Sequence, residues 1–142
     1  MGVVRFVGVA GVGLALAASV AISGAIAAEA GLSGYQGAWL IQGSSCTETY
    51  SSAGKGVLFK KPVDMFAPAF IVSGNRLRTP MASCRIKSVR PAGERQVLDL
   101  NCANAVAGGE RRVLLATLPD GSLRRYTNDQ DSVGTAYQKC SR

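Results

Sequence analysis

Four cysteines have the greatest chemical potential in this 142-residue chain, and their spacing restricts what they can do. Cys46, Cys84, Cys102 and Cys140 are separated by 38, 18 and 38 positions. Zinc sites and thiol redox centres use cysteines a few positions apart, and the sequence contains no Cys-x-x-Cys pair. We therefore expect two disulfides, which form in oxidising compartments.

Histidine is absent from the sequence. This absence removes the commonest general base, the usual metal ligand and the standard partner of a Ser or Cys nucleophile. No glycine-rich phosphate loop follows the first 30 residues either. We therefore predict no catalytic residue, no metal and no cofactor.

Paired carboxylates are the remaining route to catalysis, as in glycosidases. Most of the acidic residues fall in predicted turns or on outward strand positions, which makes a carboxylate-based hydrolase the least favoured function. These residues are Glu48, Asp64, Glu94, Asp99, Glu110, Asp120, Asp129 and Asp131.

An uncharged N-terminal segment precedes the cysteines. It runs from position 6 to position 28, and Arg5 stands directly before it. The small residues of Ala25-Ile26-Ala27 predict a signal peptide over residues 1–27, with cleavage after Ala27 or after Ala30. The alternative is an uncleaved anchor, because the segment is long enough to span a bilayer. In both cases we expect residues 28–142 to form one domain, periplasmic or secreted, with no stable membrane insertion once the signal is cleaved.

Short apolar or alternating runs separated by turn residues indicate an all-β fold after residue 30. We expect a small antiparallel β-barrel, or a barrel-like sandwich, of about eight strands. Turn chemistry predicts hairpins at Gly74-Asn75 and at Pro119-Asp120-Gly121. The candidate strands are 38–42, 47–50, 56–60, 69–73, 76–79, 84–89, 96–102, 111–117, 122–127 and 135–140.

A third hairpin follows from the cysteines. If Cys84 faces Cys102 in an antiparallel pair, the turn centres on Gly93, and apolar residues share the face of the sulfurs. Two further pairs then face each other: Ile86 with Leu100, and Ser88 with Leu98. We therefore prefer a bridge between Cys84 and Cys102. A bridge between Cys46 and Cys140 follows by elimination and ties an early strand to the last one, although the other two connectivities remain open.

Positive charge dominates, with 16 Lys and Arg against 9 Asp and Glu. Two basic pairs, Arg76 with Arg78 and Arg85 with Lys87, each flank an apolar residue, so we expect both on outer faces of neighbouring strands. They are candidate binding residues for an unknown envelope protein or anionic polymer. The alternative is that they serve solubility and protect strand edges. We expect no nucleic-acid partner, because the chain is exported and offers few aromatic residues for stacking.

Trp39 is the sole tryptophan and lies in Gly37-Ala38-Trp39 at the start of the first expected strand. A lone tryptophan on a β-strand usually belongs to the core. A Gly-x-Trp motif followed by many short strands resembles the lipocalin-type barrels and the smaller secreted bacterial barrels related to protease inhibitors. In those families the tryptophan closes the barrel floor, which implies structural roles for Gly37 and Trp39.

A longer likeness covers most of the domain. The residues that carry it are Gly37, Trp39, Cys46, Phe59, the segment 70–75, Cys84-Arg85-Ile86, Leu98, Leu100, Cys102, Tyr137 and Cys140. In this order they resemble small secreted four-cysteine proteins of alphaproteobacteria, a group that supplies no activity to carry over.

The sequence as a whole favours an exported, non-catalytic binding protein of the cell envelope that docks or inhibits a partner. The inhibitor role rests on fold analogy alone. A small carrier of apolar ligands, of lipocalin type, is the alternative. Its difficulty is that short eight-stranded barrels are usually filled by their own side chains. An open apolar cavity would distinguish the carrier from the docking protein.

Overall fold

The computed structural model describes residues 31–53 and 56–141, and the expected signal peptide over 1–27 lies outside them. A short 3-10 helix, η1 (Ser33–Tyr35), leads into the first strand, and a four-residue helix, α2 (Cys46–Thr49), follows it. Neither helix is long and apolar enough to cross a membrane. The strands are β1 (Gly37–Ile41), β2 (Tyr50–Ala53), β3 (Gly56–Phe59), β4 (Ala69–Ser73), β5 (Arg76–Arg78), β6 (Ser83–Ala92), β7 (Arg95–Ala103), β8 (Gly108–Thr117), β9 (Leu123–Tyr126) and β10 (Thr135–Lys139).

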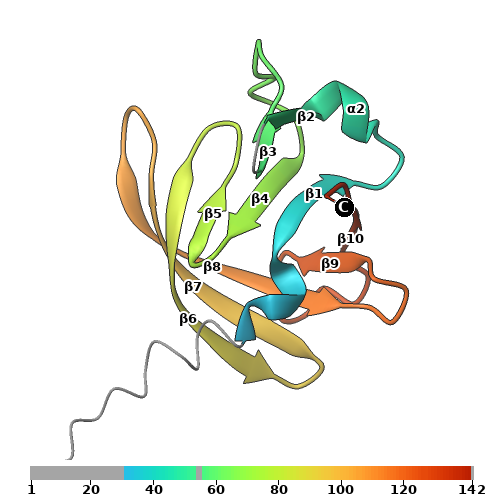
Figure 1. Cartoon of the computed structure of the whole chain (residues 1–142). Helices are drawn as coiled ribbons and strands as arrows, with labels where there is room; N and C mark the ends of the chain where they lie inside the picture. Colours follow the sequence, from blue (N-terminus) through green and yellow to red (C-terminus); the bar gives the residue numbers. More distant parts are fainter. Residues whose placement is uncertain (1–30, 54–55, 142) are drawn as a thin grey trace, which may run out of the picture.

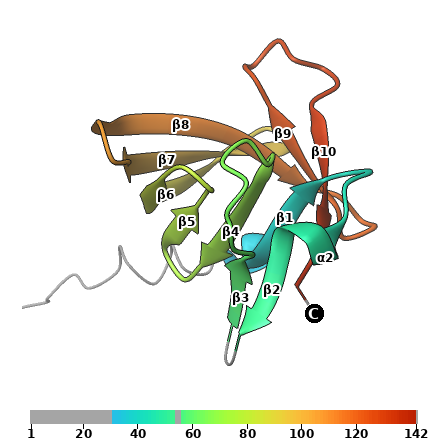
Figure 2. The ribbon, with the colours of Figure 1, turned by 90° about the horizontal axis from the view of Figure 1, so that it is seen from above.

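Eight of these strands close into an antiparallel barrel in the order β1-β10-β9-β8-β7-β6-β5-β4, and β4 pairs again with β1. The predicted all-β barrel is therefore confirmed. Figures 1 and 2 show β2 and β3 as a separate hairpin outside the barrel. The turns predicted at Gly74 and Gly121 are both present, and both glycines adopt positive φ.

The β6–β7 hairpin confirms the first half of the expected register. Cys84 faces Cys102 and is bonded to it, and the next inward pair is Ile86 with Leu100. A β-bulge at Lys87 then shifts the register by one residue. The expected pair of Ser88 with Leu98 is consequently wrong.

Beyond this bulge Val89 faces Leu98, and Ser88 faces Asp99. The shift sends the Ser88 hydroxyl to the outer face, where it donates to Asp99 Oδ2 at 2.8 Å. Val89 instead packs against the barrel core. Burying valine while leaving serine a polar partner favours the bulged register over the regular one.

One end of the barrel is closed by the η1 segment, which we call the floor. Leu32, Tyr35 and Trp39 are almost completely buried there, and Trp39 retains only 1% exposure. The indole Nε1 of Trp39 donates to the Tyr35 carbonyl at 2.7 Å. Burial raises the pKa of Tyr35 to about 12. The floor is therefore solid, hydrogen-bonded core.

Gly37 allows the chain to enter β1 at this end. Its φ is +115°, and a Cβ there would collide with the hydroxyl of Ser141. That hydroxyl accepts a hydrogen bond from the Ala38 amide at 3.2 Å. The Gly-x-Trp motif thus combines a backbone position that suits only glycine with the largest side chain of the floor.

The β2–β3 hairpin covers the outer face of β1 and β4. Tyr50 packs there with Leu40 and Ile71 in a second apolar cluster. Its hydroxyl lies 2.6 Å from the Trp39 carbonyl and 3.1 Å from the Phe70 carbonyl, and burial raises its pKa. This cover makes β1 apolar on both faces.

The predicted second bridge, between Cys46 and Cys140, is also confirmed. The strand predicted over 47–50 is wrong except at Tyr50, because Cys46–Thr49 form α2 and β2 begins at Tyr50. The Thr49 amide donates to the Ser45 carbonyl at 3.3 Å, and the Thr49 hydroxyl donates to the same carbonyl at 3.1 Å. These local bonds close one helical turn before Tyr50 begins β2. The bridge joins this turn to the residue after β10.

Candidate functional site

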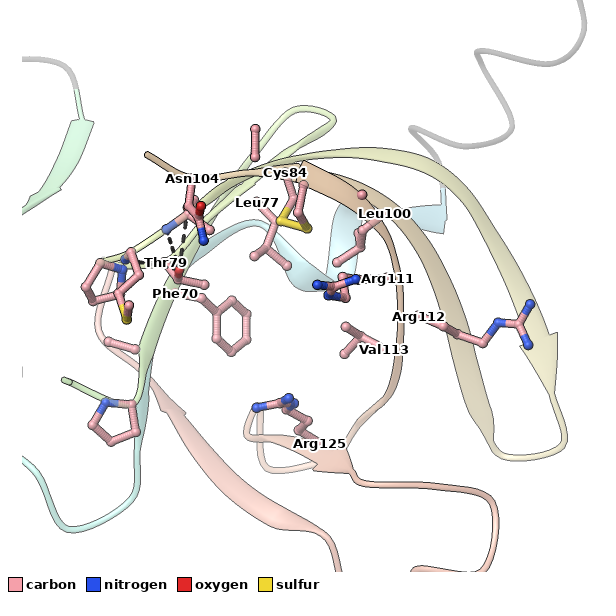
Figure 3. A pocket seen from close by; sticks show the side chains of 18 of the residues that line it. Phe70, Leu77, Thr79, Cys84, Leu100, Asn104, Arg111, Arg112, Val113 and Arg125 are labelled. Atoms are coloured by element: carbon pink, nitrogen blue, oxygen red, sulfur yellow. Dashed lines mark hydrogen bonds between the residues drawn. A yellow bond between two sulfur atoms is a disulfide. The ribbon is translucent and has the colours of Figure 1, made fainter. Parts of the chain in front are cut away.

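A cavity of about 480 Å³ opens into the barrel at the end opposite the floor. Its walls are mainly apolar and come from strands all round the barrel, including Phe70, Leu77, Leu100 and Val113 (Figure 3). The Cys84–Cys102 disulfide forms part of the wall beside Leu77. The interior is thus filled at the floor and hollow at this end, which we call the open end.

The turns that frame the open end are held by their own polar side chains. Thr79 Oγ1 accepts hydrogen bonds from the amides of Met81 and Ala82, at 3.3 and 3.0 Å. Asn104 Oδ1 accepts from the amides of Val106 and Ala107, at 2.9 and 2.7 Å. Such bonds restrict the backbone of the β5–β6 and β7–β8 turns. The entrance therefore has a defined frame.

Large apolar side chains stand exposed around this frame. Met65 and Met81 line the cavity and are both about half exposed. Phe66 and Val106, next to lining residues, are 87% and 93% exposed. Exposed apolar groups that gather at the mouth of a hollow mark a surface for binding.

Two arginines reach into the cavity from neighbouring strands. Arg111 lies opposite Leu100 across β7 and β8, and Arg125 lies opposite Leu115 across β8 and β9. Opposite residues of an antiparallel pair point to the same face, so both arginines share the inner face with leucines. Figure 3 shows their guanidinium groups on either side of Val113.

The alternation of inward and outward residues in the sequence indicates the inner positions of these arginines. In β8, Arg111, Val113 and Leu115 alternate with outward residues, and Arg125 stands two positions after the buried Leu123. A charge that continues an apolar alternation is expected on the inner face of a barrel strand. The sequence-based prediction of binding residues did not include these two arginines, which contributed only to the total positive charge.

Asp and Glu are absent from the described lining of this cavity, and two of the predicted carboxylates form hydrogen bonds elsewhere. Asp99, on the outer wall, binds Arg90 at 2.8 Å and Arg112 at 3.2 Å. The hydrogen bond from Arg90, with further ones from Ser88 and Arg112, lowers the pKa of Asp99 to about 2. Asp131 accepts amide hydrogen bonds within its own loop, the largest effect coming from Thr127, and its pKa also falls to about 2.

Glu48 and Asp64 share a second hollow, of about 410 Å³, between α2 and the segment before β4. Both residues are exposed, and Asp64 Oδ1 accepts the Phe66 amide at 2.9 Å within its own turn. Lys60 borders the same hollow. Asp99 and Glu110 border another hollow on the wall of β6, β7 and β8, and neither carboxylate pair borders the barrel cavity.

The candidate basic residues lie on the outer wall as expected. Arg76 faces Arg85 directly across β5 and β6, and Arg78 faces Ser83. Lys87 lies at the bulge and forms an ion pair with Glu110 of β8, which raises the Lys87 pKa. Three of the four predicted residues thus form an outer basic surface, made of Arg76, Arg78 and Arg85.

Comparison with known proteins does not extend this picture. Neither a protein-family model, nor a curated protein, nor a solved structure matches the chain. The likeness to secreted four-cysteine proteins stays a prediction, and the function has to be argued from the cavity and the surface.

Proposed function

We propose that this chain is an exported binding protein that holds a small, mainly apolar ligand in the open end of its barrel. One observation carries the proposal: a cavity of about 480 Å³ that the protein's own side chains leave unfilled. Small-molecule sites typically measure roughly 300–1,000 Å³ and are lined by apolar groups with a few polar ones. The geometry therefore supports the carrier better than the docking protein.

Export is part of the same proposal. The uncharged N-terminal segment with its cleavage pattern supports secretion or a periplasmic location. Two disulfides suit the same oxidising environment. A non-catalytic role agrees with cavity walls that carry arginines and no carboxylate among the described lining residues.

The test uses the neutral fluorescent probe N-phenyl-1-naphthylamine, which brightens in apolar surroundings. We expect saturable binding by the wild-type protein. Val113 is half-buried and faces the cavity, so Val113→Trp should fill the space and abolish this binding. Val133→Trp is the matched control, because Val133 is 69% exposed in the loop before β10. Absence of probe binding by the wild type would contradict the proposal.

The outer basic surface supports a second candidate function, the docking of an anionic envelope protein or polymer. Like charges directly opposite each other destabilise a sheet, and Arg76 faces Arg85 with no carboxylate within 4.0 Å among the described residues. A bound polyanion would relieve this repulsion. Changing Arg76, Arg78 and Arg85 together to Glu should abolish retention on a dextran sulfate column at low salt, and unchanged retention would exclude this surface.

A further inference from the structure

The charges inside the cavity differ from those on the outer wall. On the wall, Arg90 and Arg112 are paired with Asp99, and Lys87 is paired with Glu110. Neither Arg111 nor Arg125 has a carboxylate within 4.0 Å in the part of the chain that the structure describes. Two cations therefore face an apolar hollow without a protein counter-ion.

Their hydrogen-bonding capacity is also largely unused. A guanidinium group carries five N–H donors in a fixed fork that fits the oxygens of a carboxylate or phosphate. Arg111 uses Nη1 on the neighbouring Glu110 carbonyl, at 2.9 Å. The Arg125 side chain donates to no group among residues 31–53 and 56–141. Figure 3 shows the two guanidinium groups at the edge of the central space of the pocket, one on each side of Val113.

The two arginines differ from their neighbours in the face of the sheet that they occupy. On the same two strands, Arg112 and Arg124 occupy the outer face, which is where a charge serves solubility at the lowest cost. Arg111 and Arg125 occupy inner positions that continue the rows of Val113, Leu115 and Leu123. Both side chains are exposed to solvent, so an anion that enters the cavity can reach their guanidinium groups.

We propose that the cavity binds an anionic amphiphile, with its aliphatic chain against Phe70, Leu77 and Leu100 and its acidic head group between Arg111 and Arg125. This inference rests on the proposed ligand-binding function and specifies the class of ligand. The shared chemistry is an oxyanion on a hydrocarbon chain, either a fatty carboxylate or an alkyl phosphate. The disulfide and the floor side chains limit how deep the chain reaches.

The experiment measures displacement of N-phenyl-1-naphthylamine by decanoate, decyl phosphate and 1-decanol, which share one chain and differ in the head group. We expect the wild-type protein to bind the better of the two anions at least about tenfold more tightly than the alcohol, the size of one charge-assisted hydrogen bond. A stronger effect of decanoate identifies a carboxylate, and a stronger effect of decyl phosphate identifies a phosphate head group.

Variants of the inner arginines test whether these residues cause the preference for anions over decanol. Changing Arg111 and Arg125 together to Gln should remove the preference of the protein for the two anions over decanol. The matched control changes Arg85 and Arg124 to Gln, which removes the same charge from the outer face at two residues that do not line the cavity. An equal loss of preference in the control would overturn the inference, because net charge rather than the inner arginines would then be responsible.

The wild-type protein supplies a readout that needs no variant. Lowering the pH until decanoate is protonated should remove its advantage over decanol. If the probe binds and decanoate never exceeds decanol, the inference fails while the proposed function stands. If the probe does not bind at all, the proposed function itself fails.

Discussion

The two ends of the barrel are built from the same strands and have opposite character. At the floor, Trp39 fills the space and its indole N–H is bonded to Tyr35. The Gln36 side chain also holds the β4–β5 turn by exchanging two hydrogen bonds with Gly74, at 2.9 and 3.0 Å. At the open end, a hollow remains and two arginines lack partners of opposite charge within the described chain.

This contrast separates stability from binding. Dense packing and satisfied polar groups at the floor contribute to the free energy of unfolding. An unfilled apolar hollow forgoes such packing, and the proposed function assigns this space to a ligand. Changes at the floor should therefore lower stability, and changes at the open end should lower affinity.

Removing a disulfide should have the largest effect on stability. The Cys46–Cys140 bridge spans 94 positions and the Cys84–Cys102 bridge spans 18. Chain entropy predicts losses of about 4–5 kcal/mol for the double change Cys46→Ala with Cys140→Ala, and about 3 kcal/mol for Cys84→Ala with Cys102→Ala. Denaturant unfolding measures both. Only the loss of the Cys84–Cys102 bridge should also weaken probe binding, because only its sulfurs border the cavity. Weaker probe binding after loss of the Cys46–Cys140 bridge alone would contradict the division between the two ends.

Trp39→Ala should have the next largest effect on stability, a loss of about 3–5 kcal/mol in the free energy of unfolding. Deleting the indole leaves a void beneath Phe70 and frees the Tyr35 carbonyl. Arg111→Gln is the comparison at the open end and should change stability by less than about 0.5 kcal/mol. Similar losses for the two variants would show that both ends support the fold equally.

Gly37→Ala should cost less, about 1–2 kcal/mol, because an L-residue is strained at this φ and its Cβ displaces the Ser141 hydroxyl. Gly43→Ala is the matched control. Gly43 also has positive φ, at +91°, but a Cβ there meets no atom within 4 Å. The difference between their thermal midpoints measures the collision alone, and equal midpoints would mean that contact with Ser141 carries no cost.

The smallest expected effect is the change of stability with pH that Asp99 causes on the outer wall. The folded-state pKa of Asp99 lies at about 2, below its ordinary value of 3.8, so ionised Asp99 stabilises the fold above pH 3.8. This contribution is lost as the pH falls through 2. The wild-type protein should accordingly be more stable than Asp99→Asn at neutral pH, with the difference shrinking between pH 4 and pH 2. A stability difference that stays constant between pH 4 and pH 2 would contradict the assignment.

Much of the fold follows from local signals in the sequence. The turns at Gly74 and Gly121 and the pairing of Cys84 with Cys102 were predictable, because glycine conformation and two-residue alternation act over short distances. The bulge at Lys87 also had a signal: the apolar residues Ile86 and Val89 are three positions apart, which breaks the alternation. The helical turn at Cys46 had none that we recognised, since four residues are too few to show a helical period.

The cavity could not be predicted in the same way. Its volume depends on how strands distant in the sequence tilt and how far their side chains reach, which no local pattern records. The inner positions of Arg111 and Arg125 were encoded in the alternation of β8 and β9. That these arginines meet at an open hollow became visible only in the closed barrel.

The most direct test of ligand binding at the open end is a methyl NMR titration of the wild-type protein with decanoate. Resonances of Leu77, Leu100 and Val113, which line the cavity, should shift and saturate together. Leu32, buried in the floor, should keep its shifts. Shifts confined to the floor or to the outer wall, or no saturable shift at the cavity residues, would contradict the account.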